Sequence, residues 1–357
     1  MPTSPTFPGL PAHPHQLEVQ EFDTYALIVD LRGAADYEDD HLPGAVSVPW
    51  SGQPTPLAVE EGNPGLIYAL EAKLAAVPRG EPVLAYCGRG GLDSAEVAAQ
   101  LQRRGHVVHV LPGGWANYRR WVTTSIEVLS RVLGFRWIRS PPGGAAQAVL
   151  AVLEAQGLQV LPLASILSQQ RLPGLSLRGD AVPSQPAFES RLVDALRRLD
   201  PGRVVWVDET LLLGDGVGLP APLRGALRRA PLLTLDVDLA IRVEALRSQL
   251  EAQTAPIVSL IDAVADSVVG IAPAGRPLLL DAARKLADQG RSGEAITALL
   301  TECIDRLYDE FAPPKVADAD AVLRLESLLP TTIWANLQAL PEPWPDSLQP
   351  DEDQISP

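Results

Sequence analysis

The chain has 357 residues, of which 46% are hydrophobic and 20% charged, a globular composition with room for two or three domains. Its net charge of −15 disfavours general attraction to DNA or RNA, so any contact with nucleic acid needs a local basic patch. Two cysteines cannot build a disulfide framework or a four-thiolate zinc site, and the five histidines do not lie at metal-ligand spacing. With no secretory signal and no apolar run of ~18 residues, we expect a cytoplasmic protein that binds neither membrane nor metal.

The first part of the chain predicts an extended arm followed by an α/β domain. A proline at every third position of residues 1–16 favours an extended, disordered arm. Over residues 17–134, predicted strands alternate with predicted helices, and such alternation is typical of a parallel sheet. The predicted strands are Ala26–Asp30, Ala45–Val48, Pro82–Tyr86 and Val107–Leu111, and the predicted helices are Leu66–Val77 and Asp93–Arg104.

A second α/β domain is predicted over residues 135–250. Its strands are expected at Phe135–Ile138, Leu158–Leu161, Val204–Val207 and Leu232–Leu235, with helices at Ala145–Gln156 and Phe188–Leu199. Beyond about residue 238 only helical periodicity remains, so residues 251–340 are expected to form a helical region. Residues 341–357 are acidic and rich in proline, which predicts a disordered tail.

A cysteine loop carries the clearest chemical signal. Cys87 stands at the end of a predicted strand, shortly before the start of a predicted helix. The residues that follow it are Gly88, Arg89, Gly90, Gly91, Leu92, Asp93 and Ser94. Such a loop can curl its N–H groups around the sulfur, and these groups and the helix N-terminus favour the nucleophilic thiolate. The alternative is a small buried cysteine before an ordinary turn.

The first domain resembles the rhodanese family. The matching elements are Asp30-Leu31-Arg32 after the first strand, His41-Leu42-Pro43-Gly44-Ala45, and Pro112-Gly113-Gly114-Trp115. The resemblance implies that Cys87 carries sulfur or selenium as a persulfide and that Asp30 and Arg32 are structural. Phosphatases of this fold need an arginine six residues after the cysteine, where this chain has Asp93, so a phosphatase is disfavoured.

A longer resemblance, over about residues 20–250, points to the tRNA 2-selenouridine synthases. Their loop, Cys-x-Arg-Gly-Gly-x-Arg-Ser, is matched from Cys87 to Ser94 except at one position, and Ser184–Glu189 and Trp206–Glu209 resemble two further elements. The family combines a rhodanese domain with a P-loop-like domain. The resemblance implies tRNA as partner, selenophosphate and geranyl diphosphate as co-substrates, and no tightly bound cofactor.

Two departures from that family predict weakened chemistry. Asp93 replaces the second loop arginine and would repel an anionic donor such as selenophosphate. The phosphate loop is degraded to Arg139-Ser140-Pro141-Pro142-Gly143-Gly144-Ala145-Ala146, in which alanines replace the lysine and the hydroxyl residue, so ordinary diphosphate binding is expected to fail. Asp208 and Glu209 could hold Mg²⁺ beside a diphosphate, but they also fit a solvated strand end.

The middle segment offers the basic patch that tRNA would need. Residues 135–250 carry 13 basic and 11 acidic side chains, whereas residues 1–134 carry 9 and 15. The candidate arginines are Arg191, Arg197, Arg198, Arg203, Arg224, Arg228 and Arg229, which would otherwise lie on solvated helix faces. The hypothesis is chalcogen transfer to tRNA through Cys87. The alternatives are a stand-alone sulfurtransferase or persulfide carrier and a catalytically inactive interaction protein, and the oligomeric state stays open.

Overall fold

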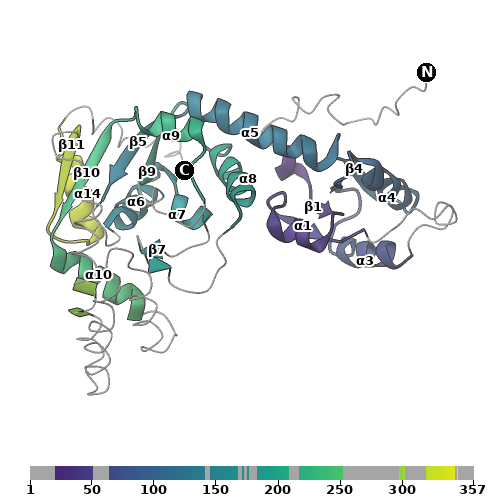
Figure 1. Cartoon of the computed structure of the whole chain (residues 1–357), viewed down its shortest axis with the longest axis horizontal. Coiled ribbons are helices and arrows are strands. Elements are labelled where there is room, and N and C mark those ends of the chain that lie inside the picture. Colours follow the sequence, from purple (N-terminus) through teal and green to yellow (C-terminus); the bar gives the residue numbers. More distant parts are fainter. Residues whose placement is uncertain are drawn as a thin grey trace, which may run out of the picture. The chain divides into compact units, whose positions relative to one another are not determined.

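The computed structural model in Figure 1 describes most of two compact units. The described residues are 21–50, 64–140, 145–167, 171–172, 175–176, 183–208, 217–251, 297–298, 300–301, 319–341 and 344. One unit comprises Met1–Leu129 and Pro183–Arg198, and the other comprises Ser130–Val182 and Leu199–Pro357. The sequence had placed Pro183–Arg198 in the second domain, so its membership of the first unit differs from the expectation. The proline-rich arm, most of the acidic tail and Cys303 lie outside the described residues.

The first unit is built on a parallel sheet whose strands follow the order β2-β1-β3-β4. The strands are β1 (Leu27–Asp30), β2 (Ala45–Ser47), β3 (Pro82–Tyr86) and β4 (Val107–Val110). The helices are η2 (Glu21–Thr24), α1 (Ala34–Asp39), α3 (Pro64–Leu74), α4 (Leu92–Arg103), α8 (Gln185–Leu196) and most of α5 (Gly114–Val132). The strands are short apolar runs, as strands covered on both faces are. Apolar side chains of α3 and α4 share one core cluster with β1, β3 and β4.

The second unit contains a five-stranded parallel sheet in the order β11-β10-β5-β9-β6. The strands are β5 (Gly134–Arg139), β6 (Gln159–Leu161), β9 (Val204–Asp208), β10 (Leu232–Val237) and β11 (Ala321–Leu325). The helices are α6 (Ala145–Ala155), α7 (Leu163–Ile166), α9 (Ala221–Leu227), α10 (Leu239–Glu251) and α14 (Pro330–Gln338), and β7 (Arg171–Leu172) pairs with β8 (Leu175–Ser176). Helices α6 and α14 bury apolar side chains in one cluster with Trp206 and Leu233.

The α/β class with two parallel sheets is confirmed, but the expectation of only helices after residue 238 is wrong at β11. This strand pairs in parallel with β10 along its whole length, from Leu233 opposite Ala321 to Val237 opposite Leu325. Its burial alternates, because β11 is an edge strand with one face in the core and one face exposed. Five residues are too few for a period of two to stand out from the surrounding helical pattern. Among the described residues, no helix is both long and apolar enough to cross a membrane.

Candidate functional site

The candidate site is the loop that joins β3 to α4. Cys87 directly follows the apolar strand β3 and therefore lies at the carboxyl edge of the first sheet. The cysteine is 1% exposed. The hydroxyl of Ser94 donates a hydrogen bond to Cys87 Sγ over 3.5 Å and another to the carbonyl of Gly91 over 3.1 Å. Gly90 and Gly91 adopt positive φ values of 65° and 101°, so the backbone curls there as glycine permits. The sulfur therefore lies inside the loop, next to a side-chain donor.

A second turn holds this loop from outside. The N–H of Trp115 donates to the carbonyl of Cys87 over 3.0 Å, and Gly113 and Gly114 both have positive φ. A Cβ on Gly114 would collide with the Cys87 carbonyl oxygen, so only glycine allows this approach. The Gly-Gly-aromatic turn thus has a direct role in placing the cysteine.

Asp30 and Arg32 form a buried network beside the cysteine loop. The Arg32 guanidinium binds both carboxylate oxygens of Asp30 and stacks on the Trp115 ring with its carbon 3.6 Å from the centroid. Tyr86, the last residue of β3, donates its hydroxyl to Asp30 over 2.6 Å, and burial raises the pKa of that phenol. The Arg32 side chain also lies against Gly88. This pair therefore joins β1, β3 and the start of the cysteine loop.

Asp93 cancels the charge of the loop arginine. Its carboxylate accepts hydrogen bonds from Arg89 Nε at 3.0 and 2.9 Å and also pairs with a terminal nitrogen of that guanidinium. These hydrogen bonds raise the pKa of Arg89. The Asp93 side chain is 7% exposed and that of Arg89 is 56% exposed. The loop thus presents a paired arginine where the related synthase motif has two arginines.

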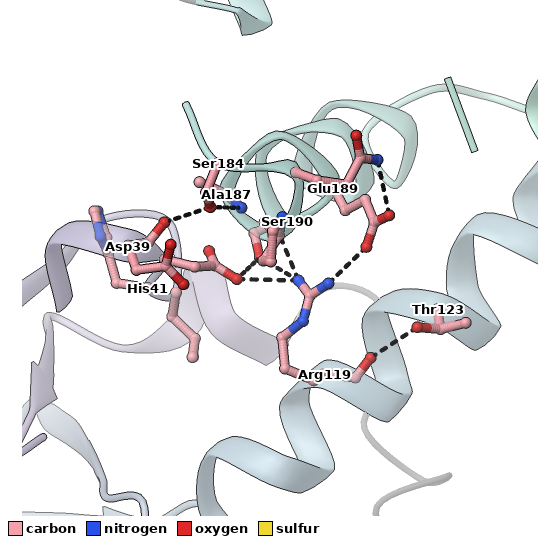
Figure 2. A network of polar contacts seen from close by, with 12 residues as sticks. Asp39, His41, Arg119, Thr123, Ser184, Ala187, Glu189 and Ser190 are labelled. Carbon is pink, nitrogen blue, oxygen red and sulfur yellow. Dashed lines mark hydrogen bonds and ion pairs between the residues drawn. The ribbon is translucent and has the colours of Figure 1, made fainter. Parts of the chain in front are cut away.

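Helix α8 is held against the cysteine-bearing unit by a polar network shown in Figure 2. Arg119 on α5 donates to Asp40, Ser190 and the carbonyl of Pro186, each over 3.0 Å, and to Glu189 over 2.6 Å. Ser190 in turn donates to Asp40 over 3.0 Å. The motif Ser184–Glu189, expected in the second domain, therefore docks on the first unit.

Two features of this network come from the local sequence. Ser184 caps α8 by accepting a hydrogen bond from the N–H of Ala187, and its hydroxyl donates to the carbonyl of Asp39.

Asp40 is 2% exposed, and burial raises the pKa of its carboxyl group although Ser190 and Arg119 oppose the shift. Its backbone carbonyl accepts from Arg32, which links the α8 network to the side chain that lies against Gly88. Sequence reasoning missed Asp40, Arg119 and Ser190.

The arginines of the predicted basic patch are divided between the two units. Arg191, Arg197 and Arg198 belong to the first unit, whereas Arg203, Arg224, Arg228 and Arg229 belong to the second. Arg197 is buried and binds both oxygens of Asp23 at 2.7 Å, so it is neither a solvated side chain nor an RNA contact.

The segment predicted to be a degraded phosphate loop is described only in part, since Gly143, Gly144 and Glu209 lie outside the described residues. Arg139 ends β5, and its guanidinium carbon lies 5.7 Å from the centroid of the Trp137 ring. Asp208 is 2% exposed and accepts a hydrogen bond from Gln147 of α6 over 3.2 Å, so the solvated-strand-end interpretation is wrong for this residue. The described residues contain no cluster of three or more His, Cys, Asp or Glu side chains suited to a metal ion.

Comparison with known proteins agrees with the geometry of the first unit. Residues 14–120 match the family model of the rhodanese-like domain. The chain contains a rhodanese-like domain. Cys87 and its loop lie within this rhodanese-like domain, as do the Asp30–Arg32 pair and the Gly113–Gly114 turn.

The similarity to distant relatives extends beyond the rhodanese-like domain. The chain is 27% identical over 247 residues to the tRNA 2-selenouridine synthase of Hahella chejuensis. This alignment covers 61% of this chain and 62% of that protein. Proteins of the same name from Chromohalobacter salexigens and Aeromonas salmonicida are 27% and 26% identical, over 62% of this chain and 64% and 63% of theirs. The matches thus span less than two thirds of these relatives. A solved structure from Bacillus halodurans is 22% identical over 30% of this chain and 69% of its own, with a TM-score of 0.22 that supports no conclusion.

Proposed function

We propose that this protein is a rhodanese-type chalcogen transferase in which Cys87 carries sulfur or selenium as a persulfide for transfer to tRNA. The observation that carries the proposal is the position of Cys87, at the carboxyl end of β3 and at the start of a loop curled by Gly90 and Gly91. The rhodanese-like domain supports the carrier role. The name shared by the distant relatives, tRNA 2-selenouridine synthase, supports tRNA as the acceptor and 2-selenouridine as the product.

Loading of the cysteine follows from thiolate chemistry. With thiosulfate as donor, the Cys87 thiolate attacks the outer sulfur, a new S–S bond forms, the old S–S bond breaks and sulfite leaves with its electron pair. The Ser94 hydroxyl, which donates to Sγ, stabilises the negative charge before attack. Because Cys87 is buried while Gly88, Arg89 and Gly90 are exposed, donor access requires displacement of this exposed part of the loop.

Geranylation is not part of the proposal. The lysine and hydroxyl positions of the phosphate loop are Ala145 and Ala146, which are 0% and 3% exposed and face the core of the second unit. Neither side chain can neutralise or hydrogen-bond a diphosphate. Geranyl diphosphate therefore has no conventional site at this edge of the sheet.

A loading experiment tests the carrier role. The full-length protein is incubated with thiosulfate and measured by intact mass spectrometry, and we expect the mass of one added sulfur atom that a reducing agent removes. Cys87→Ser should abolish the addition, whereas Cys303→Ser, which changes the other cysteine, should leave it unchanged. Absence of the addition on the parent protein, or its persistence in Cys87→Ser, would contradict the carrier role.

A second experiment tests the acceptor. Nucleosides of tRNA from cells with and without the gene are compared by mass spectrometry, and we expect loss of 2-selenouridine on deletion and no rescue by Cys87→Ser. Unchanged tRNA together with a loaded Cys87 would favour a second candidate, a stand-alone persulfide carrier. Ala145 and Ala146 support that candidate, because these buried alanines stand where the synthase resemblance calls for a phosphate-binding lysine and hydroxyl.

A further inference from the structure

A cavity at the amino edge of the second sheet is rich in positive charge. It has a volume of about 390 Å³, within the range of small-molecule pockets, and it lies where β5, β9 and β10 begin. Its lining includes Arg131 from the last turn of α5, Arg136 from β5, and Arg229 just beyond α9. The remaining lining residues are uncharged, so three arginines and no acidic residue line the cavity in a chain with a net charge of −15.

Helix dipoles explain two of these arginines but not the third. Arg131 and Arg229 stand at the carboxyl ends of α5 and α9, where cations offset the partial negative charge of the last carbonyls. Arg136 lies on a strand, and its buried Nε has no hydrogen-bond partner within the described part of the chain. Its guanidinium carbon lies 5.5 Å from the centroid of the Trp344 ring, which offers a stacking face but no acceptor.

The charge of Arg136 is incompletely balanced by its surroundings. Burial lowers the pKa of its guanidinium, and the nearby Asp320 carboxylate opposes this shift without overcoming it. Asp320 is engaged elsewhere, since it accepts a hydrogen bond from the N–H of Leu232 over 2.7 Å. An anion in the cavity would therefore supply negative charge close to Arg136.

We propose that this cavity binds a phosphate group through Arg131, Arg136 and Arg229. Three arginines that line one cavity from two helix ends and a strand suit a tetrahedral anion better than a planar carboxylate, because they belong to three different elements around it. The volume exceeds that of one phosphate ion, so the phosphate group belongs to a larger molecule, either a free nucleotide or a polynucleotide backbone. Neither Cys87 nor the predicted phosphate loop contributes to the lining of this cavity, and binding to it does not depend on chalcogen transfer.

Binding measurements on the full-length protein test the proposal. Calorimetric titration uses three probes: inorganic phosphate, adenosine monophosphate and a short single-stranded RNA lacking thiouridine. Arg229→Gln should weaken binding by about tenfold or more, as expected for loss of one charged hydrogen bond. Arg228→Gln is the matched control, since it removes an equal charge from the neighbouring exposed residue that does not line the cavity, and it should change affinity less than about twofold.

The outcomes separate the sources of the phosphate. If Arg229→Gln weakens the binding of adenosine monophosphate alone, the ligand of the cavity is a free nucleotide. If it weakens the binding of RNA in parallel, the ligand is the polynucleotide backbone. Arg136→Gln should show the same pattern where thermal unfolding shows that it folds, and Arg229→Gln suffices where it does not. Absence of saturable binding by every probe, or equal weakening by Arg228→Gln and Arg229→Gln, would overturn the proposal.

Discussion

Arg119 provides the sharpest test of how α8 is held on the rhodanese-like unit. Arg119→Met keeps the apolar stem of the side chain but removes the guanidinium that binds Asp40, Ser190 and Glu189. Asp40 is 2% exposed, so the substitution leaves a buried carboxylate whose remaining side-chain donor is Ser190. Removing one partner of a buried ion pair costs about 3–5 kcal/mol. Because the Arg119 side chain is 22% exposed and Ser190 remains, we expect a loss of about 2–4 kcal/mol.

The loss should depend on pH in a defined direction. Burial raises the pKa of Asp40 in the folded protein, so its favourable contribution is present below the unfolded pKa and is lost as pH rises through the folded pKa. Removing Arg119 raises that folded pKa further, because the positive charge no longer favours the carboxylate. The destabilisation by Arg119→Met should therefore be full at pH values where Asp40 is ionised, and it should shrink as the pH falls through the raised pKa of Asp40.

Urea unfolding followed by tryptophan fluorescence at several pH values measures this effect. Arg120→Met is the matched control, because Arg120 is the exposed neighbour on α5 and bonds within its own helix to Asn117. It should cost less than about 0.5 kcal/mol. Adding Asp40→Asn to Arg119→Met should recover part of the stability, since no buried charge then lacks its partner. Equal effects of the two arginine substitutions, or a pH-independent loss, would refute the reasoning.

Three further predictions follow from individual contacts. Asp93→Arg should raise the rate of thiosulfate loading of Cys87 by about tenfold, because it frees Arg89 and adds a second positive charge. Stopped-flow detection of released sulfite measures this rate, and an unchanged rate would show that the ion pair does not limit donor capture. Asp23→Asn should lower the free energy of unfolding by about 1 kcal/mol at neutral pH, because hydrogen bonds from Arg197 and Arg198 lower the Asp23 pKa. In acid-unfolding curves the difference from the parent should disappear as the pH falls through that lowered pKa, and a difference that persists in acid would contradict the assignment. Gly114→Ala should lower the free energy of unfolding by more than about 2 kcal/mol, because its positive φ and a clash with the Cys87 carbonyl act together. Thermal unfolding measures this loss, and a smaller loss would mean that the turn can rearrange at little energetic cost.

Local signals in the sequence predicted much of the first unit. Short apolar runs ending in turn residues located β1, β3 and β4 to within a residue or two, and the glycines after Cys87 predicted the curled loop. These features depend on neighbours in the chain, whose patterns a sequence displays directly. The Arg89–Asp93 contact was also within reach, since the two residues are four apart at a helix start.

Contacts between distant segments could not be predicted in this way. Nothing in the sequence distinguishes Arg119, which joins α5 to α8, from the exposed Arg120 beside it. The docking of α8 depends on residues 67 or more positions apart, and without the fold these residues have no reason to be paired. Strand β11 was missed for the same reason, because its partner β10 ends more than 80 residues earlier.

A group of three arginines in the second unit lies at the edge of the sheet opposite to the one where a ligand was expected. Open α/β sheets commonly bind ligands outside the carboxyl ends of their strands, where β5 ends at Arg139 and β9 ends at the buried Asp208. Here that edge lacks the lysine that a phosphate loop requires, whereas Arg136 and two further arginines surround a cavity at the amino ends. If the cavity binds phosphate while geranyl diphosphate leaves the protein unaffected, the second unit has kept its affinity for phosphate esters at a new position. Binding of geranyl diphosphate that survives Arg229→Gln but fails in Asp208→Asn would instead mean that the original edge still functions without its lysine.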